Sequence, residues 1–120
     1  MVHAVFQRDS QGAVSSFTLD GHTGLAPHGH DLVCAAVSAL GQGILIGLEA
    51  VVGLDVQVEV AGGRLRCTLP APLPDGAGDQ AAVLLETLVL SLRSIERDHE
   101  DALQVRELHF GKGGGSDALH

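Results

Sequence analysis

Hydrophobic and polar positions change period several times in the first third of the chain. Residues 2–8 alternate loosely, and residues 13–19 are rich in β-branched and aromatic side chains, with a turn at residues 9–12 between them. This arrangement predicts a β-hairpin. Residues 20–30 contain four glycine or proline positions besides polar side chains, and they predict a long loop.

A continuous apolar run follows the loop and predicts a buried helix. It opens at Asp31, whose carboxylate suits the N-cap position, and it ends near Val52, just before a glycine. Its length is borderline for a membrane span, which needs about 20 apolar residues. Because no Lys or Arg anchors and no Trp or Tyr belt flank the run, we expect a helix of a soluble protein and no membrane contact.

The second half of the chain repeats the pattern of two strands and a helix. Residues 56–60 alternate valines with polar side chains, which predicts a half-buried strand, and residues 64–69 form the next strand after a Gly-Gly turn. A second helix is expected from a cap at Asp79 to about Arg97, and a last strand over residues 103–110. The apolar stripe of this helix is Leu85, Leu88, Leu92 and Ile95, and its solvent side carries Glu86, Arg93 and Arg97.

These elements predict one α+β domain over residues 1–110. Their order is ββαββαβ, and the short hairpins indicate a mostly antiparallel sheet with two helices packed on it. Residues 111–120 are rich in glycine and are expected to form a disordered tail.

Composition and charge narrow the function classes. Fifteen acidic against 7 basic residues give a net charge of -8, and Trp and Tyr are absent. This composition disfavours both a basic face and an aromatic stacking surface, and we expect no direct binding to nucleic acid. The N-terminus lacks the apolar region of a secretion signal. We therefore expect a cytoplasmic protein whose two cysteines, Cys34 and Cys67, are reduced.

The segment from Gly21 to Cys34 carries the candidate chemistry. With Asp31 as the N-cap, Cys34 falls in the first turn of the helix, where the helix dipole favours a thiolate and free N–H groups can hold an oxyanion. His22 on the loop can then act as general base and acid. The alternatives are a small core cysteine and a solvated loop histidine. For Cys67, between Leu65 and Leu69, a core position is the expectation.

Two further interpretations come from the same region. His22, His28, His30 and Cys34 are four candidate zinc ligands, although their spacing matches no known zinc module. On the helix, small residues recur every four positions and allow another backbone to approach closely. Because the helix is apolar nearly all round, we expect a homodimer, unless the sheet and the second helix cover it within one chain. The stripe consists of Ala35, Ala39, Gly43 and Gly47.

The sequence resembles the ribosomal-processing cysteine protease (Prp) family. The resemblance lies in a Gly-His pair at residues 21–22, a glycine-bearing loop, and Asp-Leu-Val-Cys-Ala-Ala-Val-Ser-Ala-Leu at residues 31–40. It implies a homodimeric cysteine endopeptidase that removes the N-terminal extension of large-subunit ribosomal protein twenty-seven. It implies no cofactor, because a Cys-His dyad needs no metal.

The resemblance also assigns roles to single residues. Cys34 matches the nucleophile and His22 the histidine of the dyad, while Asp31 and Ser38 match the rest of the signature beside Gly21. Gly24 and Gly29 match hinges of a loop that gates the substrate. Two other functions stay open at this point. One is a non-catalytic metal-binding or ribosome-associated factor that uses His22, His28, His30 and Cys34, and the other is a dimerisation module without a site.

Overall fold

The structure is a computed structural model that describes residues 1–21, 30–110 and 117–119. It contains six strands, two α-helices and one turn of π-helix. In chain order they are β1 (Val2–Arg8), β2 (Val14–Asp20), α1 (His30–Ile46), the π-helical turn η1 (Gly47–Val51), β3 (Gln57–Ala61), β4 (Arg64–Thr68), α2 (Ala77–Asp98), β5 (Leu103–Phe110) and β6 (Asp117–Leu119).

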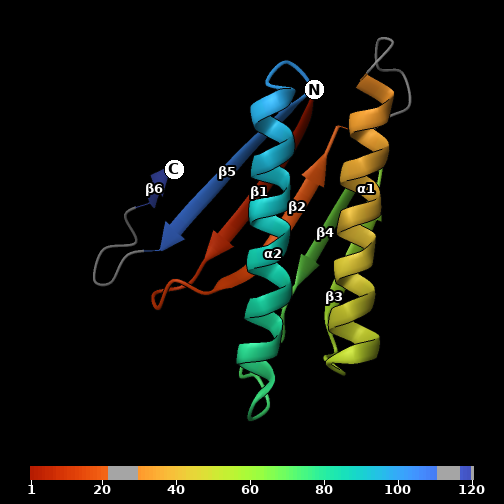
Figure 1. Ribbon diagram of the computed structural model, residues 1–120. Coiled ribbons are helices and arrows are strands. Elements are labelled where there is room, and N and C mark those ends of the chain that lie inside the picture. Colours follow the sequence, from red (N-terminus) through yellow and green to blue (C-terminus); the bar gives the residue numbers. More distant parts are fainter. Residues whose placement is uncertain (22–29, 111–116, 120) are drawn as a thin grey trace.

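The strands form one mixed sheet in the order β3-β4-β2-β1-β5-β6. Only β1 and β5 run parallel among the described strands; the other neighbours are antiparallel. Figure 1 shows α1 and α2 side by side on the same face of this sheet. The predicted α+β class, the ββαββαβ order through β5 and the mostly antiparallel pairing are therefore confirmed.

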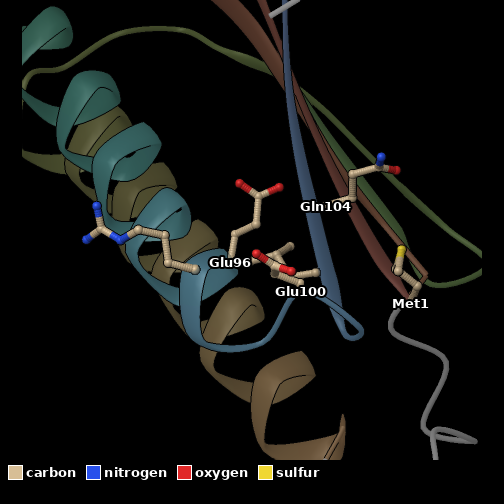
Figure 2. Close-up of a pocket in the computed structure, with 6 residues that line it drawn as sticks. Met1, Glu96, Glu100 and Gln104 are labelled. Carbon is tan, nitrogen blue, oxygen red and sulfur yellow. The ribbon is translucent and has the colours of Figure 1, made fainter.

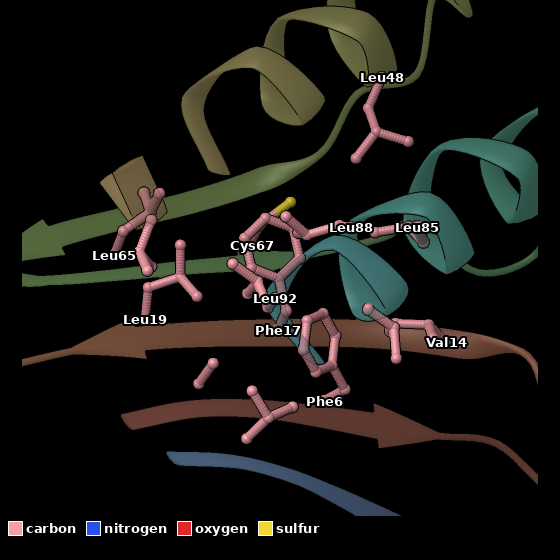
Figure 3. Close-up of a cluster of buried hydrophobic side chains, with 14 of the residues drawn as sticks. Phe6, Val14, Phe17, Leu19, Leu48, Leu65, Cys67, Leu85, Leu88 and Leu92 are labelled. Carbon is pink, nitrogen blue, oxygen red and sulfur yellow. The ribbon is translucent and has the colours of Figure 1, made fainter. Parts of the chain in front are cut away.

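The core lies between this face and the two helices. Alternate positions of each strand point inward, so that β1 contributes Val2, Ala4 and Phe6, and β2 contributes Phe17 and Leu19, all at most 1% exposed. The rings of Phe6 and Phe17 are tilted, with centroids 6.1 Å apart. Figure 3 shows them facing the leucines that α2 turns toward the sheet. These are Leu85, Leu88 and Leu92, three of the four residues of the predicted stripe; the fourth, Ile95, is partly buried.

Both helices begin earlier than their predicted caps. α1 starts at His30, so Asp31 lies inside the first turn instead of preceding the helix. α2 starts at Ala77 after Gly76, whose φ of 81° is left-handed, and Asp79 lies in its first turn. An acidic residue there still interacts favourably with the helix dipole, but it is not the cap.

The apolar helix ends through a change of helical type. The N–H of Val52 donates to the carbonyl of Gly47 at 2.9 Å, five residues back, which defines the π-turn. Gly53 then stops the helix with a φ of 85°, as predicted. By length and composition alone Leu32–Val51 is able to span a membrane. In this fold it packs on the sheet through Val33, Val37 and Leu48.

Two predictions about strands are wrong. All five residues of β3 are exposed, so it is an open edge strand and not a half-buried one. Its Val60 is 75% exposed. At the other edge, Asp117–Leu119 pairs antiparallel with Leu108–Phe110, so that part of the expected disordered tail joins the sheet. The remaining tail positions lie outside the described residues.

The solvent side predicted for α2 is also partly wrong, because Glu86 and Arg93 tie the helix to the sheet. Arg8 of β1 donates to both carboxylate oxygens of Glu86 at 2.6 and 2.9 Å, and to Glu107 of β5 at 2.8 Å. Arg93 donates to the other oxygen of Glu107 at 2.8 Å. Burial raises the pKa of Glu107, but the hydrogen bonds from Arg93 and Arg8 outweigh it and hold that pKa below its ordinary value. Arg97 is exposed, as predicted.

Candidate active site

Cys34 is a free, partly buried thiol at the beginning of α1, and it packs against the edge of the hydrophobic core. It is the fifth residue of a helix that starts at His30. Its position therefore differs from the predicted first turn. The N–H groups without an intrahelical partner belong to residues 30–33, one turn before the thiol, and the dipole effect weakens beyond that turn.

Gly21 directly follows β2 in a conformation that only glycine adopts easily. Its φ is 107°, and a Cβ atom at this position would overlap the backbone carbonyl oxygen of Met1. Both the backbone conformation of Gly21 and the neighbouring carbonyl of Met1 therefore exclude a side chain at the position before His22. This is a physical reason for glycine in the Gly-His pair.

Ser38 lies one turn after Cys34 on the same side of α1. Its hydroxyl accepts a hydrogen bond from the amide of Gln42 at 3.1 Å, one further turn along the helix. Both side chains line a groove of about 330 Å³ between α1 and the strands β2, β3 and β4. Sequence reasoning found Ser38 but missed Gln42 and the groove. The four-residue spacing from Ser38 to Gln42, which puts both side chains on one side of a helix, is the sequence signal that points to Gln42.

Several predicted site residues are not placed. His22, Gly24, His28 and Gly29 lie outside the described residues. His30 and Asp31 are in the first turn of α1, but their side chains are not described. The predicted Cys-His dyad, the supporting role of Asp31 and the gating loop therefore stay predictions. The four-ligand zinc interpretation depends on the same positions and stays one too. Among the residues that the structure describes, no group of three candidate metal ligands comes together.

The second cysteine has the environment predicted for it. Cys67 is 1% exposed and belongs to the core cluster. Burial, with a smaller contribution from the carboxylate of Glu49, raises the pKa of its thiol to about 11. At neutral pH it is a protonated core side chain without nucleophilic character.

A second hollow, of about 290 Å³, lies between the end of α2 and the beginning of β5 (Figure 2). Its acidic members are Glu96 and Glu100, and Figure 2 shows both near the gap between helix and strand. Glu96 accepts the N–H of Val105 at 2.7 Å, which makes it a structural link between α2 and β5. None of the residues that line this hollow comes from α1. We place the candidate active site along α1, because the predicted site residues Cys34 and Ser38 lie there.

Comparison with known proteins identifies the family. The sequence pattern of the family described as "Cysteine protease Prp" matches residues 1–104. The chain belongs to the Prp family. It is thus a cysteine peptidase, as the resemblance implied.

The named relatives are bacterial Prp proteins. The ribosomal processing cysteine protease Prp of Bacillus subtilis is 34% identical over 107 residues, which cover 88% of this chain and 96% of that protein. The Prp protein of Staphylococcus aureus is 29% identical over 103 residues, covering 81% and 90%.

Solved structures share the fold. A crystal structure from Streptococcus mutans superposes with a TM-score of 0.80 at 25% identity, covering 91% of this chain and 95% of that one. The S. aureus Prp protease in complex with a substrate peptide gives a TM-score of 0.79 at 23% identity, covering 89% and 99%. The two-helix, mixed-sheet architecture is therefore that of the Prp structures.

Proposed function

We propose that this chain is an endopeptidase that removes the N-terminal extension of large-subunit ribosomal protein twenty-seven. The observation that carries the proposal is the match to the Prp family over residues 1–104, with curated relatives named ribosomal processing cysteine protease. The net charge of -8 suits a basic ribosomal substrate through long-range attraction.

Cys34 is the nucleophile in this proposal. A cysteine protease needs a reactive thiol, and the chain has two cysteines. Cys67 is buried with a pKa of about 11, whereas Cys34 is only partly buried and lies one helical turn before Ser38, which lines a groove. The contrast supports Cys34.

The reaction proceeds through an acyl-enzyme. The Cys34 thiolate attacks the carbonyl carbon of the scissile peptide bond, and His22, protonated, gives its proton to the leaving amine as the C–N bond breaks. His22 then takes a proton from water, the hydroxide attacks the thioester, and the thiol is regenerated. In this scheme Asp31 and Ser38 support the dyad. Gly21 sets the direction of the chain into His22, while Gly24 and Gly29 act as hinges of the gating loop.

We propose further that the protein works in the cytoplasm as a homodimer, without direct binding to nucleic acid. The outer side of α1 supports the dimer, because Leu32 is 77% and Ile46 61% exposed. Between them Ala39 and Gly43 are also exposed, and a Cβ atom on Gly43 would meet nothing within 4 Å. Gly47, the last residue of the small-residue stripe, lies against α2, since a Cβ atom there would be 3.0 Å from Leu84.

The test is cleavage of a synthetic peptide with the sequence of the ribosomal extension, followed by mass spectrometry. Wild type and Cys67→Ala should cleave it, while Cys34→Ala and His22→Ala should lose cleavage and keep the wild-type circular dichroism spectrum. Cleavage by Cys34→Ala would contradict the mechanism. Zinc bound stoichiometrically by an inactive wild-type protein would instead support the metal-binding alternative.

A further inference from the structure

The groove beside Ser38 has an apolar floor and a mixed wall. Leu19 and Leu65 lie next to each other on neighbouring strands and form the buried part of the floor (Figure 3). Val60 of β3 completes the floor and is 75% exposed. On the helix side the wall changes from hydroxyl and amide groups at one end to a carboxylate at the other. The residues concerned are Ser38, Gln42 and Glu49.

This groove begins at Ser38, one helical turn beyond Cys34. Cys34, Ser38 and Gln42 follow each other at intervals of four residues, so each lies about 6 Å further along α1. Val60 pairs with Leu65, which pairs with Leu19. Figure 1 shows that α1 runs along β3 and β4. A chain that reaches Cys34 therefore comes within about one helical turn of the groove that Ser38, Gln42 and Val60 line.

The free edge of the sheet borders the same groove. β3 is the terminal strand in the sheet order, and all its residues are exposed. Its Val58 and Val60 share the face on which the helices lie. Unprotected edge strands with apolar side chains pair readily with another extended chain. Along β3, the free strand edge therefore supplies the polar groups and the exposed valines supply the apolar side chains that such a chain requires.

We propose that this groove is a specificity subsite, in which the peptide substrate lies extended along β3 and places an apolar side chain over Val60. The inference rests on the proposed nucleophilic role of Cys34. From Cys34 to Gln42 is about 12 Å along the helix, and an extended chain advances about 3.3 Å per residue. The subsite thus accepts the third or fourth residue from the scissile bond. Glu49, the one charged side chain among the residues that line the groove, disfavours an acidic residue there.

The occupant is a substrate chain and not a second copy, because the groove begins at Ser38, one helical turn from the proposed nucleophile Cys34, and its lining includes the carboxylate of Glu49. A self-complementary face across a two-fold axis would bring the two copies of Glu49 close to each other or leave them buried. A single bound peptide brings only one Glu49 into the interface. A basic residue that follows the apolar residue of this peptide leaves that carboxylate neither next to a like charge nor buried without a partner.

The test compares Val60→Lys with Val83→Lys as the matched control. Val83 is 67% exposed on α2 and does not line the groove. The probe is the peptide with the sequence of the ribosomal extension, together with variants in which each of the four residues on either side of the scissile bond is replaced by Ala or Glu. Cleavage is measured for Val60→Lys and Val83→Lys in a protein that keeps Cys34. Binding of the fluorescently labelled peptide is measured for the same two substitutions combined with Cys34→Ala.

We expect Val60→Lys to raise KM about tenfold or more with kcat little changed, which is the range for losing an apolar contact in a pocket. Wild type should discriminate against Ala and Glu at the third or fourth residue from the bond, and Val60→Lys should lose that preference. Val83→Lys should behave as wild type in every measurement.

Three outcomes overturn the subsite. Equal kinetics for both lysine variants show that no substrate side chain lies over Val60. Conversion to a monomer by Val60→Lys alone shows that a second copy covers the groove. A peptide that is neither cleaved by wild type nor bound by Cys34→Ala removes the proposed function and the subsite together, whereas cleavage with unaltered specificity in Val60→Lys removes the subsite alone.

Discussion

Two helices cover the same face of one sheet, and they are attached to it in opposite ways. α2 buries a row of leucines and also exchanges charged hydrogen bonds with β1 and β5 through Glu86 and Arg93. Among the described side chains of α1, residues 32–46, the structure shows one hydrogen bond, from Gln42 to Ser38 within the helix itself. α1 is held instead by close packing, with Gly41 against Leu19.

The difference separates the part of the molecule that fixes the fold from the part that carries the candidate active site. Charged links between α2 and two neighbouring strands limit sliding of that helix and leave its polar groups satisfied. α1 keeps the free thiol, the polar wall of the groove and a large exposed apolar side. Changes near α2 should therefore alter stability, and changes along α1 should alter reactivity and recognition.

The largest expected effect is the difference in alkylation rate between the two thiols. In the native protein at pH 8, iodoacetamide should alkylate Cys34 and leave Cys67 unmodified. A thiol with a pKa of about 11 is thiolate in only about one molecule in a thousand at that pH, and Cys67 is also 1% exposed. Peptide mapping by mass spectrometry over a time course measures the two rates. In guanidinium chloride both should react alike, and equal rates in the folded protein would contradict the contrast.

Arg8→Ala should destabilise the α2 side without changing the chemistry. The guanidinium is shared between Glu86 and Glu107, and its removal leaves Glu107, whose side chain is 17% exposed, with Arg93 as its ion-pair partner in this network. Loss of charged hydrogen bonds of this kind costs about 2 kcal/mol in the free energy of unfolding. Urea denaturation measures it, and kcat/KM of the same variant serves as the control. A variant as stable as wild type would show that the network contributes nothing.

The sequence predicted most of the sheet and both helices, because periods of 2 and 3.6 are directly visible in it. The same period of 2 contains a signal that the sequence interpretation missed. Val2, Ala4 and Phe6 point to the helices, and Arg8 continues their row. An arginine that points to the same face of the sheet as these buried residues requires an acidic partner. Its partners Glu86 and Glu107, however, lie 78 and 99 residues away in the sequence. Only the assembled topology shows which carboxylates they are.

Exposure of β3 was not predictable from its valines. The alternation of residues 56–60 is the same for a covered strand and for an open edge, and only the sheet order shows that β3 is the terminal strand. For the same reason the groove escaped sequence analysis, since its floor combines Leu19, Val60 and Leu65 from three strands. Cys34 could be proposed as a nucleophile from the sequence because its neighbours on the helix are local in sequence, whereas the residues of the groove are not.

Two glycines in one helix sharpen the argument that α1 is held by close packing. A Cβ atom on Gly41 would overlap Cδ1 of the buried Leu19, whereas a Cβ atom on Gly43 would meet nothing within 4 Å. Replacing a helical glycine by alanine gains about 1 kcal/mol, and overpacking a core contact costs about 1–3 kcal/mol. Gly41→Ala should therefore lower stability by about 1 kcal/mol, and Gly43→Ala should raise it by about 1 kcal/mol. Thermal unfolding distinguishes them, and equal shifts would mean that Leu19 yields freely.

The smallest expected effect is the acid sensitivity of the α2 side. The pKa of Glu107 is lowered in the folded protein from its ordinary value of 4.5. Its ionised form therefore contributes stability that is fully present above about pH 4.5 and is lost as the pH falls through the lower, folded value. Wild type should lose stability over this interval more steeply than Glu107→Gln, which has no carboxylate to protonate. Chemical denaturation at a series of pH values between about 3 and 6 measures the two slopes. Parallel slopes would show that the Glu107 carboxylate is not stabilised by Arg8 and Arg93, and the charged attachment of α2 would then have no energetic basis.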